Sequence, residues 1–381
     1  MKDFQFYNPT KIILGKNTIN QIGQAISEYK VKKVLLIAGG GSIKKNGVYD
    51  QTIASLKEAG INWVEAWGIE PNPVISRVRE LIKLAKVEKI AAVLAVGGGS
   101  VIDTAKTVAA GMFVEDPWIL FERRLNTTDA LPVFAILTIS ATGSEFDAGG
   151  VITNEEEHKK WFFMCPAVAP KVSIIDPSIQ FTLPWYQTVN GSVDAMAHIM
   201  EPYFVGGDNE ITQGIIESLL RSIVTLTNRL QKNKNDYEAR AGIAWAAALA
   251  LSGIPQAGQG FADSTPHALE HAISAYNHTV SHGAGLAVTF PAWISYCYDA
   301  NPKQFERWAK NVWEANTVEE AINKFKNQIK AWGHPTTLKE LGVKEEQIRN
   351  IAQNALEFGL PTIVKKLGTD EMEEILRAAW K

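Results

Sequence analysis

Short apolar runs that end at glycine or threonine recur through the first 180 residues of the chain. They lie at 34–38 (VLLIA), 90–96 (IAAVLAV) and 133–137 (VFAIL). Runs of this length without polar alternation are typical of strands that are buried on both faces of a parallel sheet. Segments 52–59 and 74–85 carry apolar residues at three- and four-residue spacing, which predicts helices between the strands. The alternation therefore predicts repeated βα units.

The strand pattern disappears after Pro184. Segments 210–230, 237–251 and 317–332 keep apolar residues at helical spacing, and turn residues interrupt them. We therefore predict an α/β plus all-α chain. Its Rossmann-like parallel-sheet domain spans residues 1–180, and its helical domain spans residues 181–381.

Composition and charge exclude several classes of protein. The chain has 38 basic and 41 acidic residues, whereas nucleic-acid binders usually carry a basic surface. Its 2 cysteines cannot build a disulfide framework, which favours a reducing compartment. The start has no signal-peptide pattern, and no apolar run approaches the about 18 residues of a membrane-spanning helix. We expect a cytoplasmic enzyme that binds neither nucleic acid nor membrane.

Three glycine- or hydroxyl-rich turns follow the predicted strands, at 39–42, 97–100 and 138–145. A strand that ends in glycine and opens a helix presents backbone N–H groups that suit a phosphate. Neither glycine turn has the G-x-G-x-x-G spacing, so tight turns without a ligand are the alternative interpretation. Three such turns at the carboxyl ends of parallel strands favour a dinucleotide.

The first of these turns favours NADP over NAD. It contains no acidic residue, which NAD-binding folds often use to hold the adenosine ribose. It offers Gly39–Ser42, with Lys44 and Lys45 just beyond, and these groups would tolerate a 2′-phosphate. The lysines could equally be ordinary surface residues.

Five of the 7 histidines lie between residues 198 and 282. Two i,i+4 pairs would each share one helix face, and a single histidine follows them: Asp194 and His198, His267 and His271, and His282. An Asp/His set of this kind can bind Fe(II), Zn, Co or Mn as a catalytic metal. The alternative is that each pair is a hydrogen-bonded structural pair.

In order along the chain, these motifs resemble the iron-containing (group III) alcohol dehydrogenases, in their NADP-dependent butanol dehydrogenase and aldehyde reductase branch. The resemblance covers essentially the whole chain. It includes the opening at 6–10, the GGGS-x-x-D-x-x-K turn at 97–106, Thr-Gly-Ser-Glu at 142–145, and the signature from Ile175 to Glu201. Together these motifs are highly specific.

The resemblance implies a dehydroquinate-synthase-like fold and a metal-dependent, NADP(H)-dependent interconversion of small primary alcohols, such as butanol, and aldehydes. It implies a metal bound by Asp194, His198, His267 and His282. Iron is the first expectation, with zinc, cobalt or manganese as alternatives. It further implies that His271 relays a proton near the nicotinamide.

The residues implied for the cofactor all lie in the first domain. Gly40, Gly41 and Ser42 match the adenosine-side turn, and Gly98, Gly99 and Ser100 match the pyrophosphate turn. Five positions would line the nicotinamide half: Asp103, Thr138, Thr142, Asp147 and Lys160. The resemblance also suggests a homodimer joined through N-terminal edge strands, and the active site is expected in the cleft between the domains.

One departure from the family pattern affects the metal site. The spacing from His267 to His282 is a residue longer than in some members, so His278 keeps a claim as a ligand although it is typical of a loop histidine. Two other functions stay open. One is a glycerol- or diol-type dehydrogenase, or a dehydroquinate-synthase-like lyase, on the same fold. The other is a nucleotide-binding protein without catalysis.

Overall fold

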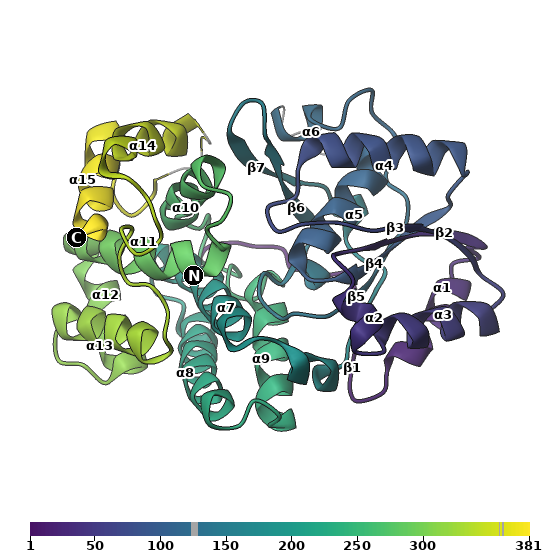
Figure 1. The fold of residues 1–381 in the computed structure, drawn as a ribbon. Helices are drawn as coiled ribbons and strands as arrows, with labels where there is room; N and C mark the ends of the chain where they lie inside the picture. Colours follow the sequence, from purple (N-terminus) through teal and green to yellow (C-terminus); the bar gives the residue numbers. More distant parts are fainter. Residues whose placement is uncertain (123–128, 358, 360–361) are drawn as a thin grey trace. The chain divides into compact units, whose positions relative to one another are not determined.

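The computed structural model describes residues 1–122, 129–357, 359 and 362–381 (Figure 1). The chain divides into two compact units, which we call the sheet unit and the helical unit. The sheet unit comprises Asn8–Leu183 and Asn235–Ala248; the helical unit comprises Met1–Tyr7, Pro184–Lys234 and Leu249–Lys381. None of the described helices combines the length and apolar character needed to cross a bilayer.

The sheet unit is built on six parallel strands in the order β1-β8-β5-β4-β2-β3 (Figure 1). The strands are β1 (Lys11–Leu14), β2 (Lys33–Ala38), β3 (Asn62–Ala66), β4 (Ala92–Gly97), β5 (Val133–Leu137) and β8 (Val172–Ile175). The three predicted strands are confirmed as β2, β4 and β5, although β4 begins at Ala92 rather than at residue 90. These strands are neighbours, so the turns that follow them lie at one edge of the sheet.

Helices cover both faces of this sheet, as its continuous apolar strands require. The helices that precede Val133 are α1 (Ile22–Ser27), α2 (Ser42–Lys45), α3 (Val48–Glu58), α4 (Ile75–Val87), α5 (Gly99–Gly111) and α6 (Ile119–Glu122). Odd-numbered residues of β2 and β4, such as Leu35 and Val93, pack with α4 and α5. Even-numbered residues, such as Leu36 and Leu94, pack with α1 and α3. The predicted helices at 52–59 and 74–85 are thus confirmed as α3 and α4.

A two-stranded antiparallel sheet formed by β6 (Gly149–Asn154) and β7 (Lys159–Met164) also belongs to the sheet unit. Short 3-10 helices connect elements of both units at Ile19–Gln21, Ser144–Phe146, Pro166–Val168, Pro177–Thr182, Tyr298–Ala300 and Glu345–Gln347. The amide of Val151 donates to Asp103 on α5 at 3.0 Å, which attaches the hairpin to the helix that opens at the second glycine turn.

The helical unit contains eight described helices. They are α7 (Trp185–Val205), α8 (Glu210–Lys232), α10 (Thr265–Tyr276), α11 (His282–Cys297), α12 (Pro302–Trp313), α13 (Val318–Ala331), α14 (Ile348–Glu357) and α15 (Thr369–Trp380). The predicted helices at 210–230 and 317–332 are confirmed as α8 and α13. Buried aromatic side chains, among them Phe204, Trp293 and Phe305, fill its core.

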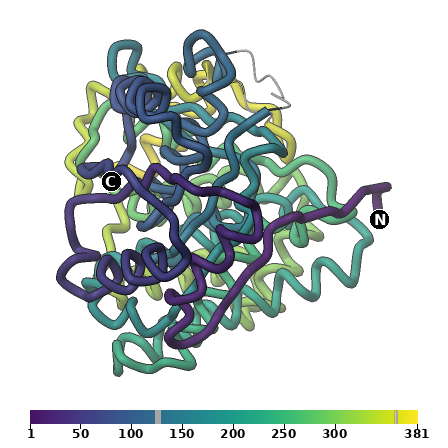
Figure 2. Tube along the Cα trace, turned by 90° about the vertical axis from the view of Figure 1, so that its right-hand side faces the viewer, coloured from purple at the N-terminus to yellow at the C-terminus, as the bar shows by residue number. Residues whose placement is uncertain are grey.

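Each unit consists of segments that are separated in the sequence. This differs from the contiguous division at residue 180 that the sequence predicts. Helix α9 (Tyr237–Ala250) lies largely in the sheet unit, because its Ala244 and Ala248 join the apolar cluster of α4 and α5. Met1–Tyr7, the extended purple segment at the N-terminus in Figure 2, belongs to the helical unit. There the amide of Lys2 donates to the carbonyl of Gly258 at 3.0 Å.

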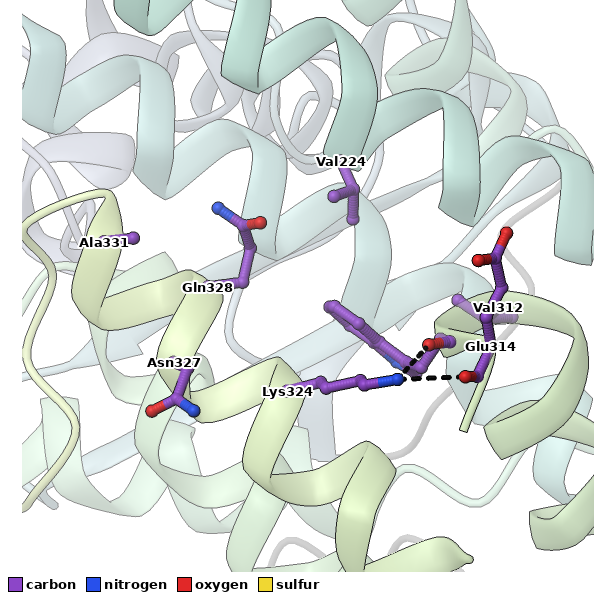
Figure 3. Close-up of a pocket in the computed structure, with 8 residues that line it drawn as sticks. Val224, Val312, Glu314, Lys324, Asn327, Gln328 and Ala331 are labelled. Atoms are coloured by element: carbon purple, nitrogen blue, oxygen red, sulfur yellow. Dashed lines mark hydrogen bonds between the residues drawn. The ribbon is translucent and has the colours of Figure 1, made fainter. Parts of the chain in front are cut away.

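A shallow depression lies among α8, α12 and α13 of the helical unit (Figure 3). Its lining includes Lys324, whose ammonium donates to the carbonyls of Trp313 at 3.2 Å and Glu314 at 2.9 Å (Figure 3). A cation at the end of a helix compensates the unpaired carbonyls there. Lys324 therefore caps α12, and none of the predicted site residues lines this depression.

Candidate metal and cofactor sites

Three helices of the helical unit carry the predicted metal-binding side chains. α7 carries Asp194 and His198, α10 carries His267 and His271, and α11 begins at His282. Both i,i+4 pairs are therefore helical, as their spacing predicts, and each pair lies on one face of its helix.

Asp263 determines where α10 begins. Its Oδ1 accepts hydrogen bonds from the amide of Thr265 at 3.1 Å and from the hydroxyl of Thr265 at 2.5 Å. Its Oδ2 accepts from the amides of Ile363 and Val364, each at 2.7 Å. A carboxylate at this position compensates unpaired N–H groups at the start of a helix. Asp263 thus joins the helix of His267 to the segment that leads into α15.

The carboxylate of Asp194 lies at the centre of the histidine cluster. Its Oδ1 is 3.1 Å from Nδ1 of His198, 3.5 Å from Nε2 of His282 and 4.0 Å from Nε2 of His267. One ligand atom from each of Asp194, His267 and His282 falls within a group no wider than 4.8 Å. The ring of His198 lies beside this group, with its centroid 4.4 Å from that of His267. The structure therefore brings ligand atoms of Asp194, His267 and His282 together and places the ring of His198 beside them.

Each of the three histidines has its Nδ1 beside a fixed acceptor. His267 Nδ1 donates to Glu201 Oε1 at 2.5 Å, and His282 Nδ1 donates to Glu270 Oε2. His198 Nδ1 donates to the carbonyl of Asp194 at 2.9 Å, one helical turn earlier. Because a carboxylate or carbonyl oxygen only accepts, the hydrogen is assigned to Nδ1, and in the neutral form of each ring the lone pair is on Nε2. This is the tautomer that binds a metal through Nε2.

The donor set fits a divalent cation. Asp194 Oδ1 and His267 Nε2 are buried, and neither has a hydrogen-bond partner within the described part of the chain. An orphaned oxygen and nitrogen are costly in a protein interior unless a ligand or ion satisfies them. Carboxylate and neutral imidazole are ligands of Fe(II), Zn(II), Co(II) and Mn(II). These residues therefore suit a divalent cation, and its binding by all four predicted ligands stays a prediction.

The protonation of the cluster depends on burial and on Asp194. Burial lowers the pKa of His267, so this imidazole is neutral at neutral pH. Burial also opposes charge on His198, but the carboxylate of Asp194 outweighs it and raises the pKa of His198 to about 9. Burial opposes the charge of Asp194 as well, yet His282 and His198 hold its pKa below the usual range. A cation that bound to His198 would have to displace its proton.

His271 lies next to the cluster, and His278 lies apart from it. The ring centroid of His271, which is buried, is 5.4 Å from that of His282 and 6.2 Å from that of His267. His278 is exposed in the turn after α10 and belongs to neither of the two described groups of potential metal ligands. The proton-relay role of His271 stays a prediction.

Sequence reasoning assigned no role to Glu201 or Glu270. Glu201 entered only as part of the family signature. Each glutamate lies three residues after a histidine, at His198 and His267, so it shares that helix face. This spacing places each glutamate beside a candidate ligand, but its burial depends on contacts with other helices that the sequence does not show.

The three turns of the sheet unit gather at one sheet edge, but their glycines differ in surroundings. A Cβ on Gly40 or Gly41 would meet nothing within 4 Å, so the first turn faces open space. A Cβ on Gly98 would overlap Ile139, and one on Gly99 would lie 2.6 Å from Thr142 Oγ1. The glycines of the second turn are therefore required by packing against the third turn, whether or not they also approach a phosphate.

Two of the residues implied for the nicotinamide half hold the third turn in place. Asp103 accepts from the Ser144 hydroxyl at 2.6 Å. Asp147 pairs with Lys106, a fully buried lysine that also donates to Ser144 Oγ at 3.0 Å and to the carbonyl of Gly149 at 2.8 Å. The motif contained Lys106, and the structure adds its role as the cation that joins these groups.

The other residues implied for the cofactor are placed in the same region of the fold. Thr138 and Thr142 lie in the third turn, where the amide of Thr138 donates to the carbonyl of Gly97 at 2.9 Å. Ser42 opens α2, Ser100 lies in the first turn of α5, and Lys160 is buried on β7. Direct contact of these residues with a cofactor stays a prediction.

The region beside the first turn holds a lysine above aromatic rings. The ammonium of Lys44 lies 4.1 Å from the centroid of the Trp67 ring and 5.2 Å from that of Tyr49. Glu65 accepts from Tyr49 and Trp63 through Oε1 and from Trp67 through Oε2. Both oxygens of this acidic residue are thus occupied by aromatic donors.

Comparison with known proteins identifies the family. The model described as "Iron-containing alcohol dehydrogenase" matches residues 9–177, and the one described as "Fe-containing alcohol dehydrogenase family, C-terminal" matches residues 188–380. The chain belongs to the iron-containing alcohol dehydrogenase family. The predicted family and two-part fold are confirmed, and membership makes the chain an oxidoreductase of the alcohol dehydrogenase class.

Individual relatives cover almost the whole chain. The probable NADH-dependent butanol dehydrogenase 2 of Bacillus subtilis is 38% identical over 362 residues, covering 92% of each chain. The NADPH-dependent aldehyde reductase YqhD of Escherichia coli is 34% identical over 359 residues, covering 91% of each chain. The crystal structure of NADH-dependent butanol dehydrogenase A from Thermotoga maritima superposes with a TM-score of 0.97 at 46% identity and covers 100% of this chain and 99% of its own.

Proposed function

We propose that this chain is a cytoplasmic, divalent-metal-dependent alcohol dehydrogenase that uses NADP(H) to interconvert small primary alcohols of the butanol class and their aldehydes. The observation that carries the proposal is the buried cluster around Asp194, in which two orphaned ligand atoms face one another. The names of the similar butanol dehydrogenases and aldehyde reductase support the substrate class.

The residues of the helical unit have separate parts in this reaction. Asp194, His198, His267 and His282 would hold the ion, with iron as the first expectation and zinc, cobalt or manganese as alternatives. Such an ion, when bound, supplies Lewis-acid polarisation of the substrate oxygen, and NADPH supplies the hydride. We assign to the imidazole of His271 the transfer of a proton between the substrate oxygen and solvent, because an imidazole exchanges protons near neutral pH.

The preference for NADP(H) rests on the first turn. Gly40 and Gly41 leave room for a phosphate, Lys44 supplies a positive charge nearby, and Glu65 is occupied by aromatic donors. Four similar butanol dehydrogenases at 37–38% identity are described as NADH-dependent, whereas three relatives at 28–34% identity are described as NADPH- or NADP-dependent, so the preference proposed here rests on the first turn and not on these names. The value of kcat/KM with NADPH should exceed that with NADH, and the opposite order would contradict this assignment.

A homodimer is the assembly that we propose. The N-terminal segment leaves Phe4 50% exposed, Phe6 52% exposed and Tyr7 84% exposed. Clustered exposed apolar side chains mark interaction surfaces. Light scattering after size-exclusion chromatography should give twice the chain mass, and Tyr7→Ser combined with Phe4→Ser should lower it. A native protein that shows the mass of one chain would contradict the dimer.

Metal dependence is tested by removal and restoration. After treatment with a chelator, the protein is assayed for butanal-dependent oxidation of NADPH, before and after addition of Fe2+, Zn2+, Co2+ or Mn2+. We expect turnover only after an ion is restored, and none in Asp194→Asn. Glu217→Gln, which removes a buried carboxylate bound to Tyr203 and Arg307 on other helices, should keep its activity. Turnover that persists without metal would contradict the proposal.

A further inference from the structure

Two buried carboxylates connect the three helices of the candidate metal centre, α7 to α10 and α10 to α11. Glu201 on α7 accepts from His267 on α10, and Glu270 on α10 accepts from His282 on α11. Glu201 is 5% exposed and Glu270 is fully buried. Each helix thus supplies a candidate ligand and, in two cases, the carboxylate that orients the histidine of the next helix.

The surrounding chain is shaped to admit both carboxylates. The second oxygen of Glu201 accepts from the hydroxyl of Ser264 at 3.0 Å. The second oxygen of Glu270 accepts from the hydroxyl of Ser274, one turn later on α10. A Cβ on Gly285 of α11 would lie 2.6 Å from Cγ of Glu270, so glycine at that position makes the space for the glutamate. These contacts hold both carboxylates in single orientations.

We propose that Glu201 and Glu270 are positioning residues, which hold His267 and His282 in the tautomer and ring orientation that bind the metal and thereby determine its affinity. The inference rests on the proposed metal dependence. A carboxylate that accepts from Nδ1–H keeps the lone pair on Nε2 and raises its basicity. In both histidines that Nε2 points towards Asp194 Oδ1, at 4.0 Å and 3.5 Å.

His198 provides an internal comparison. Its Nδ1 is held by the carbonyl of Asp194 on its own helix, not by a glutamate. Loss of either glutamate should therefore release one histidine and leave His198 in place. The defect should be a weaker, distorted site and not the loss of all ligands.

A competing role for Glu270 is direct binding of the ion. One ligand atom from each of Glu270, His271 and His282 also lies within a group no wider than 4.8 Å. The atom of His282 that faces Glu270 is Nδ1, whereas the atom that faces Asp194 is Nε2. The two roles differ in the effect of an amide. A glutamine still accepts from Nδ1–H, but it is a poor substitute for a carboxylate that ligates the ion itself.

The test is a graded series at both positions: Glu201→Gln, Glu201→Leu, Glu270→Gln and Glu270→Leu. The chelator-treated proteins are titrated with Co2+ and with Zn2+ against a chromophoric competitor, and the visible spectrum of the Co2+ form is recorded. Leucine should weaken metal binding by roughly 10- to 100-fold. Glutamine, which keeps the acceptor and loses the charge, should weaken it less. Both series should change the Co2+ spectrum.

Two variants calibrate the series. Glu217→Gln removes a carboxylate of similar burial that is bonded to Tyr203, Arg307 and Asn311, and it should bind metal as the native chain does. Asp194→Asn gives the loss caused by removal of a ligand. Unchanged affinity and spectrum in all four glutamate variants would overturn the inference, as would a loss in Glu270→Gln equal to that in Asp194→Asn. A native chain that binds neither ion would instead overturn the proposed metal dependence.

Discussion

The side-chain oxygen of Asn190 accepts a hydrogen bond from the hydroxyl of Ser281 at 3.1 Å and thereby ties α7 to the residue that precedes His282. The same oxygen accepts from Nε2 of His334 at 2.8 Å. Burial lowers the pKa of His334 to about 4, so its ring is neutral at pH 7. Asn190 lies one turn before Asp194 on α7, and Ser281 directly precedes His282 at the start of α11. This contact therefore holds the helix positions of the candidate ligands Asp194 and His282 relative to each other.

Replacement of Asn190 by alanine should loosen that relationship. It leaves the Ser281 hydroxyl and the His334 ring without their acceptor, which should lower the free energy of unfolding by about 1–3 kcal/mol. The rate at which a chelator removes bound metal should rise as well. Chemical denaturation and the kinetics of metal loss measure the two effects. Ser281→Ala should repeat them more weakly, and a double variant whose effects simply add would contradict a shared contact.

Gly283 should not tolerate a side chain. A Cβ there would lie closer than 3.0 Å to the backbone carbonyl of Asn190, so α7 and α11 would have to move apart. Gly283→Ala should therefore destabilise the chain by about 1–3 kcal/mol and weaken metal binding. Gly214 on α8 is the matched control, because a Cβ there meets nothing within 4 Å. Gly214→Ala should stabilise by up to about 1 kcal/mol through helix propensity. Equal melting temperatures for the two variants would refute the close approach.

Sequence patterns predicted the centre of the sheet unit because its strands are continuously apolar. A strand buried on both faces can be recognised without knowledge of its neighbours, as for β2, β4 and β5. The hairpin of β6 and β7 was not predicted, because β6 has only Val151 and Ile152 as apolar residues beside its glycines, and the apolar run of β7 at 161–165 is not followed by a glycine turn. The place of α9 was also missed. Periodicity shows that Ala244 and Ala248 share a buried face, but it does not show which unit covers that face.

The candidate metal centre was predicted only as far as its ligands. Aspartate and histidine at i,i+4 spacing indicate a shared helix face whatever the fold. Glu270 lies between two of the candidate histidines, yet a glutamate in a helix is usually solvated, and its full burial depends on Gly285 of another helix. Phosphate binding by Gly98 and Gly99 stays a prediction, and the structure adds a packing requirement through Ile139 and Thr142. The burial of Glu270 and this packing requirement both arise from contacts between segments distant in the sequence.

The carboxyl group of Glu145 should make stability depend on pH. It is fully buried, and neither oxygen has a hydrogen-bond partner in another described residue. Burial raises the pKa of Glu145 to about 7, so the folded chain keeps a proton that the unfolded chain loses near its ordinary value. The contribution of Glu145 to the free energy of unfolding is therefore greatest below about pH 4.5. It declines as the pH rises to about 7, and the total loss above pH 7 is about 3 kcal/mol.

Glu145→Gln should remove that slope. Its free energy of unfolding should change less between pH 5 and pH 8 than that of the native chain, whatever its absolute value. Denaturant titrations at several pH values measure the difference. Glu217→Gln serves as a control for loss of a buried carboxylate that is bonded to donors. A Glu145→Gln variant with the native pH slope would show that this carboxyl titrates at its ordinary value.

An acidic residue in the first turn should reverse the proposed cofactor preference. Gly40 has an open Cβ position and, unlike Gly41 with a φ of 100°, does not need the left-handed conformation, so Gly40→Asp should fold without strain. The new carboxylate would repel a 2′-phosphate and could accept from the ribose hydroxyls of NAD. We expect kcat/KM with NADPH to fall by about 10-fold or more relative to NADH, since each 1.4 kcal/mol of repulsion corresponds to a factor of about ten.

Lys44→Met should shift the ratio in the same direction, whereas Lys45→Met should shift it less, because Lys44 is the lysine held over Trp67. If all three variants keep the native ratio, the first turn does not face the adenosine phosphate.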